Sequence, residues 1–323
     1  MSPLSIRLIL LLFVVSAPNA FATYTTFSDY GPLRVYAQSP AQTASLTPLL
    51  RSGFALANGQ KELYISATAA SVWAETDDYF ADYYHNTLSA GLQWQFSDNW
   101  MLDANYQWRF SADNHLDSVT VWFHDALGYS QNGRGDTAKH QNQIFSSDGI
   151  HQTEFSGETL NNAFNLYLGY QLFQNASHGL SIGGSLYYNT VDSGPFANNN
   201  FEQALQLNYS YRHNRHHFHS TLGISFRQDE EVLTDISYND YALMYGLSYE
   251  YQVERHGLLI EVHHYQGVLE TDNDFSKSSN EVLLGYRYYL DNSAVEFTII
   301  ENFLNMDNST DIAFTLGYRA KLE

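Results

Sequence analysis

Phe201-Glu-Gln-Ala-Leu-Gln-Leu-Asn-Tyr-Ser-Tyr-Arg212 places Phe, Leu and Tyr side chains on one parity and mostly polar side chains on the other. A polar break, His213-Asn-Arg-His216, leads into a second alternating arm, His217-Phe-His-Ser-Thr-Leu-Gly-Ile-Ser-Phe226. Successive side chains of a strand point to opposite faces. A period of two on both sides of a tight turn therefore predicts a β-hairpin with one apolar face.

The same kind of segment recurs along most of the chain. The predicted strands are 62–74, 84–96, 100–110, 160–173, 178–190, 201–213, 216–227, 240–252, 256–268, 277–290, 294–303 and 311–322. Short connections follow the even-numbered strands and longer ones follow the odd-numbered strands, the longest being 111–159. This pattern is typical of a bacterial outer-membrane barrel, which closes because an open edge in lipid leaves backbone groups unsatisfied. We predict an all-β, transmembrane, antiparallel up-and-down β-barrel of about twelve strands over 62–323, with the short turns in the periplasm.

The first 22 residues predict export. Arg7 supplies a positive charge, Leu8 to Val15 is an apolar core, and Ala20-Phe21-Ala22 matches a cleavage site. The apolar core is too short to span a membrane, so we predict a secretory signal peptide over 1–22, cleaved between Ala22 and Thr23. The expected location is the outer membrane of a Gram-negative bacterium.

The composition excludes several classes of protein. A formal net charge of −20 opposes binding to a phosphate backbone, and we expect no nucleic-acid partner. The chain has no cysteine and therefore no disulfide framework. With 25 Tyr, 20 Phe and 5 Trp it is too aromatic for a disordered chain.

Aromatic residues near the strand ends support the predicted topology, because outer-membrane barrels carry aromatic girdles at both interfaces. The periplasmic girdle is predicted at Trp94, Phe96, Tyr170, Tyr209, Tyr211, Tyr249, Tyr251, Tyr286, Tyr288 and Tyr318. A looser outer girdle is predicted at Trp73, Tyr106, Trp108, Tyr188, Phe226 and Tyr241.

Residues 23–61 differ from the rest of the chain. They contain Pro32, Pro40 and Pro48 and show little alternation, which predicts an irregular segment. The segment is expected either in the periplasm or inside the lumen.

Two stretches resemble an uncharacterised outer-membrane family of Gram-negative bacteria, the domain of unknown function 3187 family. The first is Gly31-Pro-Leu-Arg-Val-Tyr-Ala-Gln-Ser-Pro40, and the second is His115-Leu-Asp-Ser-Val-Thr-Val-Trp-Phe-His-Asp-Ala-Leu-Gly128 followed by Asn132-Gly-Arg134. Relatives tend to read Pro-Asn-Gly-Gly-Arg where this chain has Ser130-Gln-Asn-Gly-Arg134. The resemblance covers essentially the whole mature chain and implies a membrane barrel without implying an activity.

The long connection 111–159 is predicted to be a partly helical insert. Its apolar residues between 115 and 128 fall at helical spacing, and Asp117, His124, Asp125 and Arg134 are its polar members. The insert is expected either to constrict the lumen, with these residues forming a small polar site, or to cap the outer rim. His124 and Asp125 are adjacent on a helix and do not face each other, so no catalytic pair follows from the sequence.

The strand positions predicted to face the lumen include both acidic and basic residues. Lumen or constriction candidates in the barrel wall are Asp103, Arg109, Arg227, Glu261, Glu281, Arg287, Glu296 and Arg319. The same face carries Asn105, Asn165, Gln171, Asn189, Gln206, Arg212, Glu250 and Asn302. Such a lining is either a network of ion pairs that fills the interior or a polar conduit, because eight strands are filled by side chains whereas 16–18 leave a channel.

No strong metal or cofactor motif is present. His217 and His219 share a strand face and are weak metal candidates, but Arg212 and Arg215 lie beside them, and a solvated periplasmic rim explains them more simply. We expect no cofactor. Acidic loop residues, among them Asp77, Asp229 and Asp272, either form a solvated surface or bind Ca²⁺ or Mg²⁺ diffusely.

These observations predict a monomeric barrel that is not an enzyme. The expected partners are outer-membrane lipid, lipopolysaccharide and the barrel-insertion machinery. The leading function is a narrow passive channel for a small polar or amphipathic solute, gated by the insert 111–159. The alternatives are an envelope barrel that binds lipopolysaccharide or a partner through acidic loops and, least favoured, an outer-membrane enzyme acting on lipid.

Overall fold

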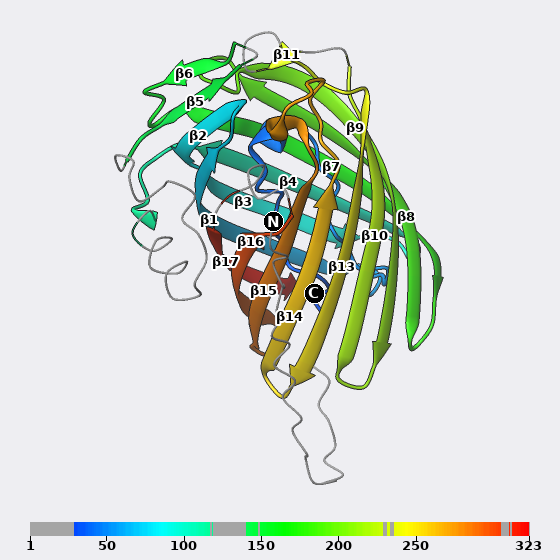
Figure 1. The fold of residues 1–323 in the computed structure, drawn as a ribbon. Coiled ribbons are helices and arrows are strands. Elements are labelled where there is room, and N and C mark those ends of the chain that lie inside the picture. Colours follow the sequence, from blue (N-terminus) through cyan, green and yellow to red (C-terminus); the bar gives the residue numbers. More distant parts are fainter. Residues whose placement is uncertain are drawn as a thin grey trace, which may run out of the picture.

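The computed structural model describes residues 29–116, 118, 140–147, 149–228, 231–232, 236–304, 310 and 312–322. The described residues form a closed barrel of twelve antiparallel strands, each paired with its neighbour in the chain (Figure 1). Pairing of the first strand with the last closes the ring, from Lys61 opposite Leu322 to Ser71 opposite Ile312. The barrel strands are β1 (Lys61–Glu75), β3 (Asn86–Gln95), β4 (Trp100–Phe110), β7 (Thr159–Gln174), β8 (His178–Val191), β9 (Asn198–His213), β10 (His216–Phe226), β13 (Tyr241–Val253), β14 (His256–Tyr265), β15 (Ser279–Tyr289), β16 (Ser293–Asn302) and β17 (Ile312–Leu322).

The structure confirms the predicted all-β barrel, and every predicted strand end lies within three residues of the observed one. Sequence analysis missed short strands in the longer connections. These are β2 (Tyr79–Tyr84), β5 (Gln143–Ser146), β6 (His151–Thr153), β11 (Glu231–Val232) and β12 (Ile236–Ser237). β2 pairs with the far half of β1 and also with β5, and so extends the sheet beyond the barrel edge. We call this end of the barrel the long-loop end and the opposite end the short-turn end.

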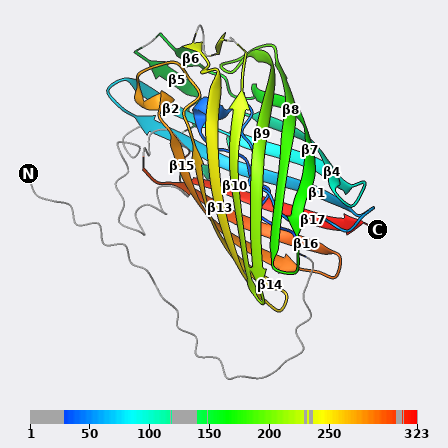
Figure 2. The same cartoon turned by 90° about the vertical axis from the view of Figure 1, so that its right-hand side faces the viewer.

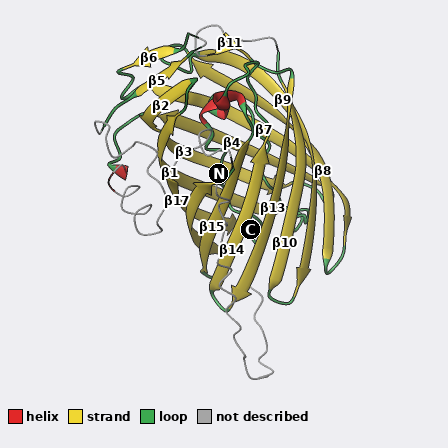
Figure 3. Ribbon diagram, viewed as in Figure 1, coloured by secondary structure: helices red, strands yellow, loops and turns green. Residues whose placement is uncertain are grey.

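Strands dominate the described residues, and helical structure is limited to short pieces such as the 3₁₀ turns η1 (Pro40–Gln42) and η3 (Asp274–Ser276) (Figure 3). No helix among the described residues has the length and apolar character needed to cross a membrane.

Alternating burial along the strands separates the lumen from the lipid-facing surface. In β9, Glu202, Gln206 and Asn208 are buried, whereas Leu205 is 56% exposed. The alternation quoted from the sequence therefore becomes a polar wall inside and an apolar wall outside, as expected for a barrel in lipid.

The short-turn end carries the predicted aromatic girdle, and three of its positions repeat one arrangement. His178, His216 and His256, the first residues of their strands, lie directly opposite the tyrosines Tyr211, Tyr251 and Tyr288. In each case histidine Nδ1 also lies within 2.8 Å of the hydroxyl of the tyrosine two positions earlier, Tyr209, Tyr249 or Tyr286. The repeated geometry thus fixes three tyrosine pairs of the girdle against a histidine of the next strand.

One outer-girdle prediction is wrong. Trp73 is only 3% exposed, and its ring packs edge-on against Phe80 of β2 at 5.4 Å. Phe80 belongs to the extra strand β2, which pairs beside β1, and the period-two pattern of β1 carried no sign of this strand.

Candidate functional site: the lumen and the segment inside it

Residues 29–56 lie inside the barrel rather than beside it (Figures 1 and 2). The segment starts at the short-turn end, reaches the long-loop end at η1, and returns to the short-turn end near Gly53. Residues 30–46 are all buried. Its three prolines lack a backbone N–H, which explains in part why this segment does not join the sheet.

Wall arginines donate hydrogen bonds to the main-chain carbonyls of this luminal segment. Arg287 reaches the carbonyl of Gly31 at 2.8 Å, and Arg319 reaches that of Pro32 at 2.8 Å. Arg109 donates to the carbonyls of Ala37 and Thr43, each at 3.1 Å, and Arg227 donates to that of Leu46 at 3.3 Å.

Wall carboxylates accept hydrogen bonds from the main-chain amides of the same segment. Glu261 accepts from Leu33 N–H at 2.8 Å, Glu281 from Gln38 N–H at 2.8 Å, and Glu202 from Leu46 N–H at 2.9 Å. Hydroxyls continue the series toward the short-turn end, where Thr221 accepts from Arg51 N–H and Ser210 from Gly53 N–H. The wall thus binds the backbone of the segment, and these hydrogen bonds do not depend on which side chains the segment carries at these positions.

At the start of the segment, two wall arginines share three wall carboxylates. Arg287 lies 2.7 Å from a carboxylate oxygen of Glu250 and 2.7 Å from one of Glu296. Arg319 lies 2.6 Å from Glu62 and 3.4 Å from Glu296. All five side chains are buried, and pairing offsets the cost of removing their charges from water.

A second buried cluster joins the segment to β1 and β4. Asp103 accepts hydrogen bonds from Arg34 at 2.8 Å, from Tyr64 at 2.6 Å and from Arg51. The Arg34 guanidinium also lies over the Tyr64 ring at 4.5 Å, and that of Arg51 lies over the Tyr167 ring at 4.0 Å. Sequence analysis assigned Asp103 to the lumen but missed its partners, because both arginines come from the irregular segment.

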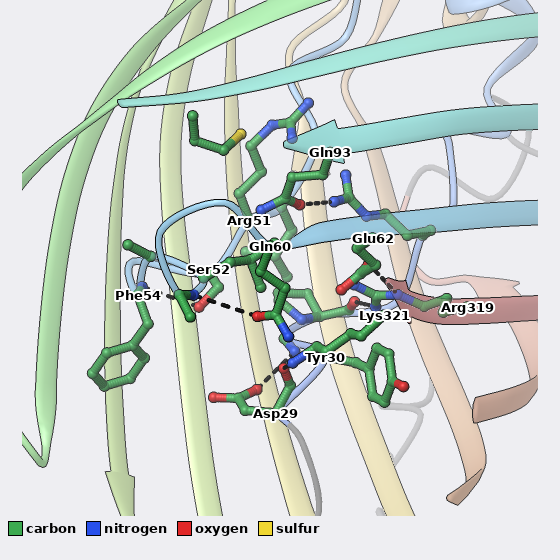
Figure 4. Close-up of a pocket in the computed structure, with 18 of the residues that line it drawn as sticks. Asp29, Tyr30, Arg51, Ser52, Phe54, Gln60, Glu62, Gln93, Arg319 and Lys321 are labelled. Atoms are coloured by element: carbon green, nitrogen blue, oxygen red, sulfur yellow. Dashed lines mark hydrogen bonds and ion pairs between the residues drawn. The ribbon is translucent and has the colours of Figure 1, made fainter. Parts of the chain in front are cut away.

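A polar cavity of about 160 Å³ remains at the short-turn end (Figure 4). Its lining includes Asp29, Tyr30, Arg34, Arg51, Gln60, Glu62, Gln93, Arg319 and Lys321. The Asp29 carboxylate lies 3.7 Å from His217 and 3.8 Å from Arg212. Burial raises the pKa of Asp29, but His217, His219 and the Gly31 amide together hold it well below its ordinary value. The cavity therefore keeps an ionised carboxylate where the described part of the segment begins.

The structure places the predicted wall candidates together around the segment. Asp103, Arg109, Arg227, Glu261, Glu281, Arg287, Glu296 and Arg319 are all buried in the lumen. Arg287 forms ion pairs with Glu250 and Glu296, whereas Glu281 accepts a hydrogen bond from the amide of Gln38. The insert candidates Asp117, His124, Asp125 and Arg134 lie outside the described residues, as does most of the predicted helix.

A solvated rim is the wrong interpretation for His217 and His219, which are 7% and 2% exposed. His219 Nδ1 lies 2.7 Å from Ser210 Oγ, so this histidine supports the wall beneath the luminal segment.

The acidic loops are described in part. Asp77 and Asp272 are exposed, and Lys277 contacts Asp274, while Asp229 lies outside the described residues. Diffuse cation binding by these loops stays a prediction.

Several solved structures are similar to this fold. The COG4313 outer membrane channel from Pseudomonas putida F1 is 12% identical, with 83% of this chain and 97% of that chain covered and a TM-score of 0.53. The NanC porin is 10% identical over 80% of this chain and 100% of that chain, with a TM-score of 0.46. The CymD monoaromatic hydrocarbon channel is 12% identical over 83% and 90%, with a TM-score of 0.41. The first of these supports the fold, that of an outer-membrane β-barrel.

No curated protein matches the sequence. The family model described as "Protein of unknown function (DUF3187)" matches residues 5–322, in agreement with the resemblance found in the sequence. The chain therefore belongs to the DUF3187 family.

Proposed function

We propose that this protein is a passive outer-membrane channel for a small polar or amphipathic solute, closed at rest by the luminal segment 29–56. One observation carries the proposal: charged and polar wall groups bind the main chain of this segment through hydrogen bonds along its whole course. When the segment moves, the same groups line a polar path that water can occupy.

The size of the cavity beside the luminal segment supports closure at rest. The 160 Å³ cavity lies below the range of about 300–1,000 Å³ that is usual for small-molecule sites. Passage of a solute therefore requires that the segment shifts along the wall or leaves the lumen. Its hold is noncovalent, because the chain has no cysteine, and a shift breaks only hydrogen bonds, ion pairs and packing contacts.

The absence of cysteine also allows a direct test. A Cβ built on Gly223 lies 2.7 Å from the Cβ of Pro48, on the wall and on the segment respectively. A shift of about 1 Å gives the Cβ spacing of a disulfide, about 3.8 Å. The double variant Pro48→Cys, Gly223→Cys should therefore tether the segment to β10 when oxidised.

In planar bilayers, we expect the oxidised double variant to remain closed and the reduced form to show openings like those of the wild type. Each single cysteine variant is the matched control and should not respond to reductant. Equal conductance before and after reduction, or wild-type protein that stays electrically silent with no solute flux into liposomes, would overturn the proposal.

Gating by the insert 111–159 is a separate part of the proposal. Deletion of 113–135 should raise conductance in the wild-type background, but should leave the oxidised cysteine pair closed. A conductance rise in both backgrounds would assign closure to the insert rather than to the luminal segment.

A further inference from the structure

Asp113, His115 and His140 converge at the two ends of the long insert. Asp113 and His115 follow the end of β4 at Phe110, and His140 precedes β5, which begins at Gln143. Among the residues that the structure describes, they form the one group of three His, Asp or Glu side chains able to share a metal ion.

The ligand atoms have suitable spacing. Asp113 Oδ2 lies 3.3 Å from His115 Nδ1 and 2.7 Å from His140 Nδ1, and all three ligand atoms lie within 4.8 Å of one another. In a tetrahedral zinc site with bonds of about 2.0–2.2 Å, neighbouring ligand atoms lie roughly 3.3 Å apart. A small adjustment of two exposed imidazoles therefore suffices to admit an ion.

The backbone holds both histidines in place. His115 has φ +60° and His140 has φ +64°, both in the left-handed region that few non-glycine residues adopt. The two rings meet edge-to-face at 5.5 Å, and the Tyr84 hydroxyl on β2 lies 3.1 Å from His140 Nδ1. Two separate parts of the chain thus meet at these side chains.

We propose that Asp113, His115 and His140 form a divalent transition-metal site that joins the two ends of the insert. Two imidazole nitrogens and one carboxylate oxygen favour Zn²⁺, Co²⁺ or Ni²⁺ over Ca²⁺ and Mg²⁺, which prefer oxygen ligands. The exposed position leaves room for water as a further ligand. This site is independent of the proposed channel function and of the acidic loops.

The test is calorimetric titration of the tag-free, folded barrel in detergent with Zn²⁺, with Mg²⁺ in parallel. We expect one Zn²⁺ per chain and no comparable Mg²⁺ binding. His115→Ala, His140→Ala and Asp113→Asn should each weaken Zn²⁺ binding more than about 100-fold, because even outer-shell partners of a metal ligand are worth about 10–100-fold. The matched control is His151→Ala, another exposed histidine of the same long connection, which should bind as the wild type does.

Co²⁺ supplies a second readout, since its visible absorption bands report nitrogen and oxygen coordination directly. The bands should appear in the wild type and in His151→Ala and be lost in the three site variants. Heat-modifiable migration on gels verifies that every variant is folded. Absence of Zn²⁺ binding in the wild type, or binding that survives all three substitutions, would overturn the site and would show that the three side chains form only a hydrogen-bonded cluster.

Discussion

The two ends of the lumen are filled in different ways. At the short-turn end, buried arginines and carboxylates bind the main chain of the luminal segment, and a polar cavity remains. At the long-loop end, Arg109 and Arg227 also bind the main chain of the segment, but here apolar side chains from the loops and strand ends pack into one cluster that includes Tyr83, Ile144, Phe155, Phe196 and Phe275.

The difference indicates separate roles for the two ends. Directional hydrogen bonds at the short-turn end hold a backbone in register, and they can exchange with water if the segment moves. The apolar cluster resembles the core of a soluble domain and loses its stabilisation when hydrated. We therefore expect the short-turn end to control the state of the lumen and the long-loop end to provide stability.

The largest expected effect is that of Arg287→Ala. The substitution removes the cation that Glu250 and Glu296 share, leaves Arg319 at 3.4 Å as a remaining partner of Glu296, and removes the Arg287 donor from the carbonyl of Gly31. Breaking a buried pair in this way costs about 4 kcal/mol. Urea unfolding in lipid vesicles should show the loss, and bilayer recordings should show more frequent openings.

Arg255→Ala is the matched control for Arg287→Ala. Arg255 pairs with Asp291 at 2.8 Å, but both side chains are exposed, so the pair is worth only about 0–1 kcal/mol. Equal losses in the two variants would contradict the importance of the buried cluster.

Phe275→Ala tests the opposite end. Phe275 is fully buried, and its ring lies 4.8 Å from that of Tyr79, so its removal should cost about 3 kcal/mol. Unfolding should become easier while bilayer openings stay as in the wild type. Leu304→Ala is the control, since Leu304 is 66% exposed. A rise in conductance for Phe275→Ala would assign gating to the long-loop end as well.

Gly53→Ala tests how closely the returning arm of the segment lies on the wall. An added Cβ would lie 2.5 Å from the Gly179 carbonyl oxygen and 2.8 Å from the Ser210 nitrogen, and backbone atoms cannot easily move aside. Overpacking of this kind costs about 1–3 kcal/mol, and we expect the arm to lift and conductance to rise. Gly184→Ala, on the lipid-facing side of β8, meets its nearest neighbour at 3.2 Å and should change conductance little.

The smallest expected effect concerns pH and Asp29. Its lowered pKa means that its ionised form stabilises the folded protein. This contribution is present above the unfolded pKa, about 3.9, and disappears as the pH falls through the folded value. The charged or titratable groups around it include His217, His219, Arg212, Lys321 and Glu250.

Unfolding measured from pH 6 to pH 3 checks this expectation. The stability difference between the wild type and Asp29→Asn should be constant above pH 5 and shrink toward pH 3. A stability difference that grows on acidification would show that the ionised Asp29 carboxylate destabilises the folded protein.

The lipid-facing surface of the barrel was predictable because the membrane imposes the same requirement on every strand: apolar side chains face the hydrocarbon and aromatic side chains lie at the interfaces. Leu205, Leu222 and Leu258 must face lipid, and tyrosines such as Tyr209 must lie at the interface, so a period of two specifies strand and face together. The covered Trp73 marks the limit of this rule, since another strand of the same protein replaced lipid as its neighbour.

The lumen was predictable only in part. The alternation of the strands predicted that Arg287 and Glu296 face the lumen. Their proximity was predictable because they lie on neighbouring strands. The partners contributed by residues 29–56 were not predictable, because an irregular chain has no period that reveals what it contacts. Asp113 and His140 likewise lie 27 positions apart, and only the folded connection brings them together.

The sequence by itself thus determined a barrel, its strand boundaries and the two faces of its wall, because backbone hydrogen bonding and lipid leave a spanning strand little freedom. Only the tertiary structure decided that the irregular segment lies within the lumen, that wall charges bind its backbone, and that the two ends differ. These features depend on contacts between distant residues, whose geometry no local pattern encodes.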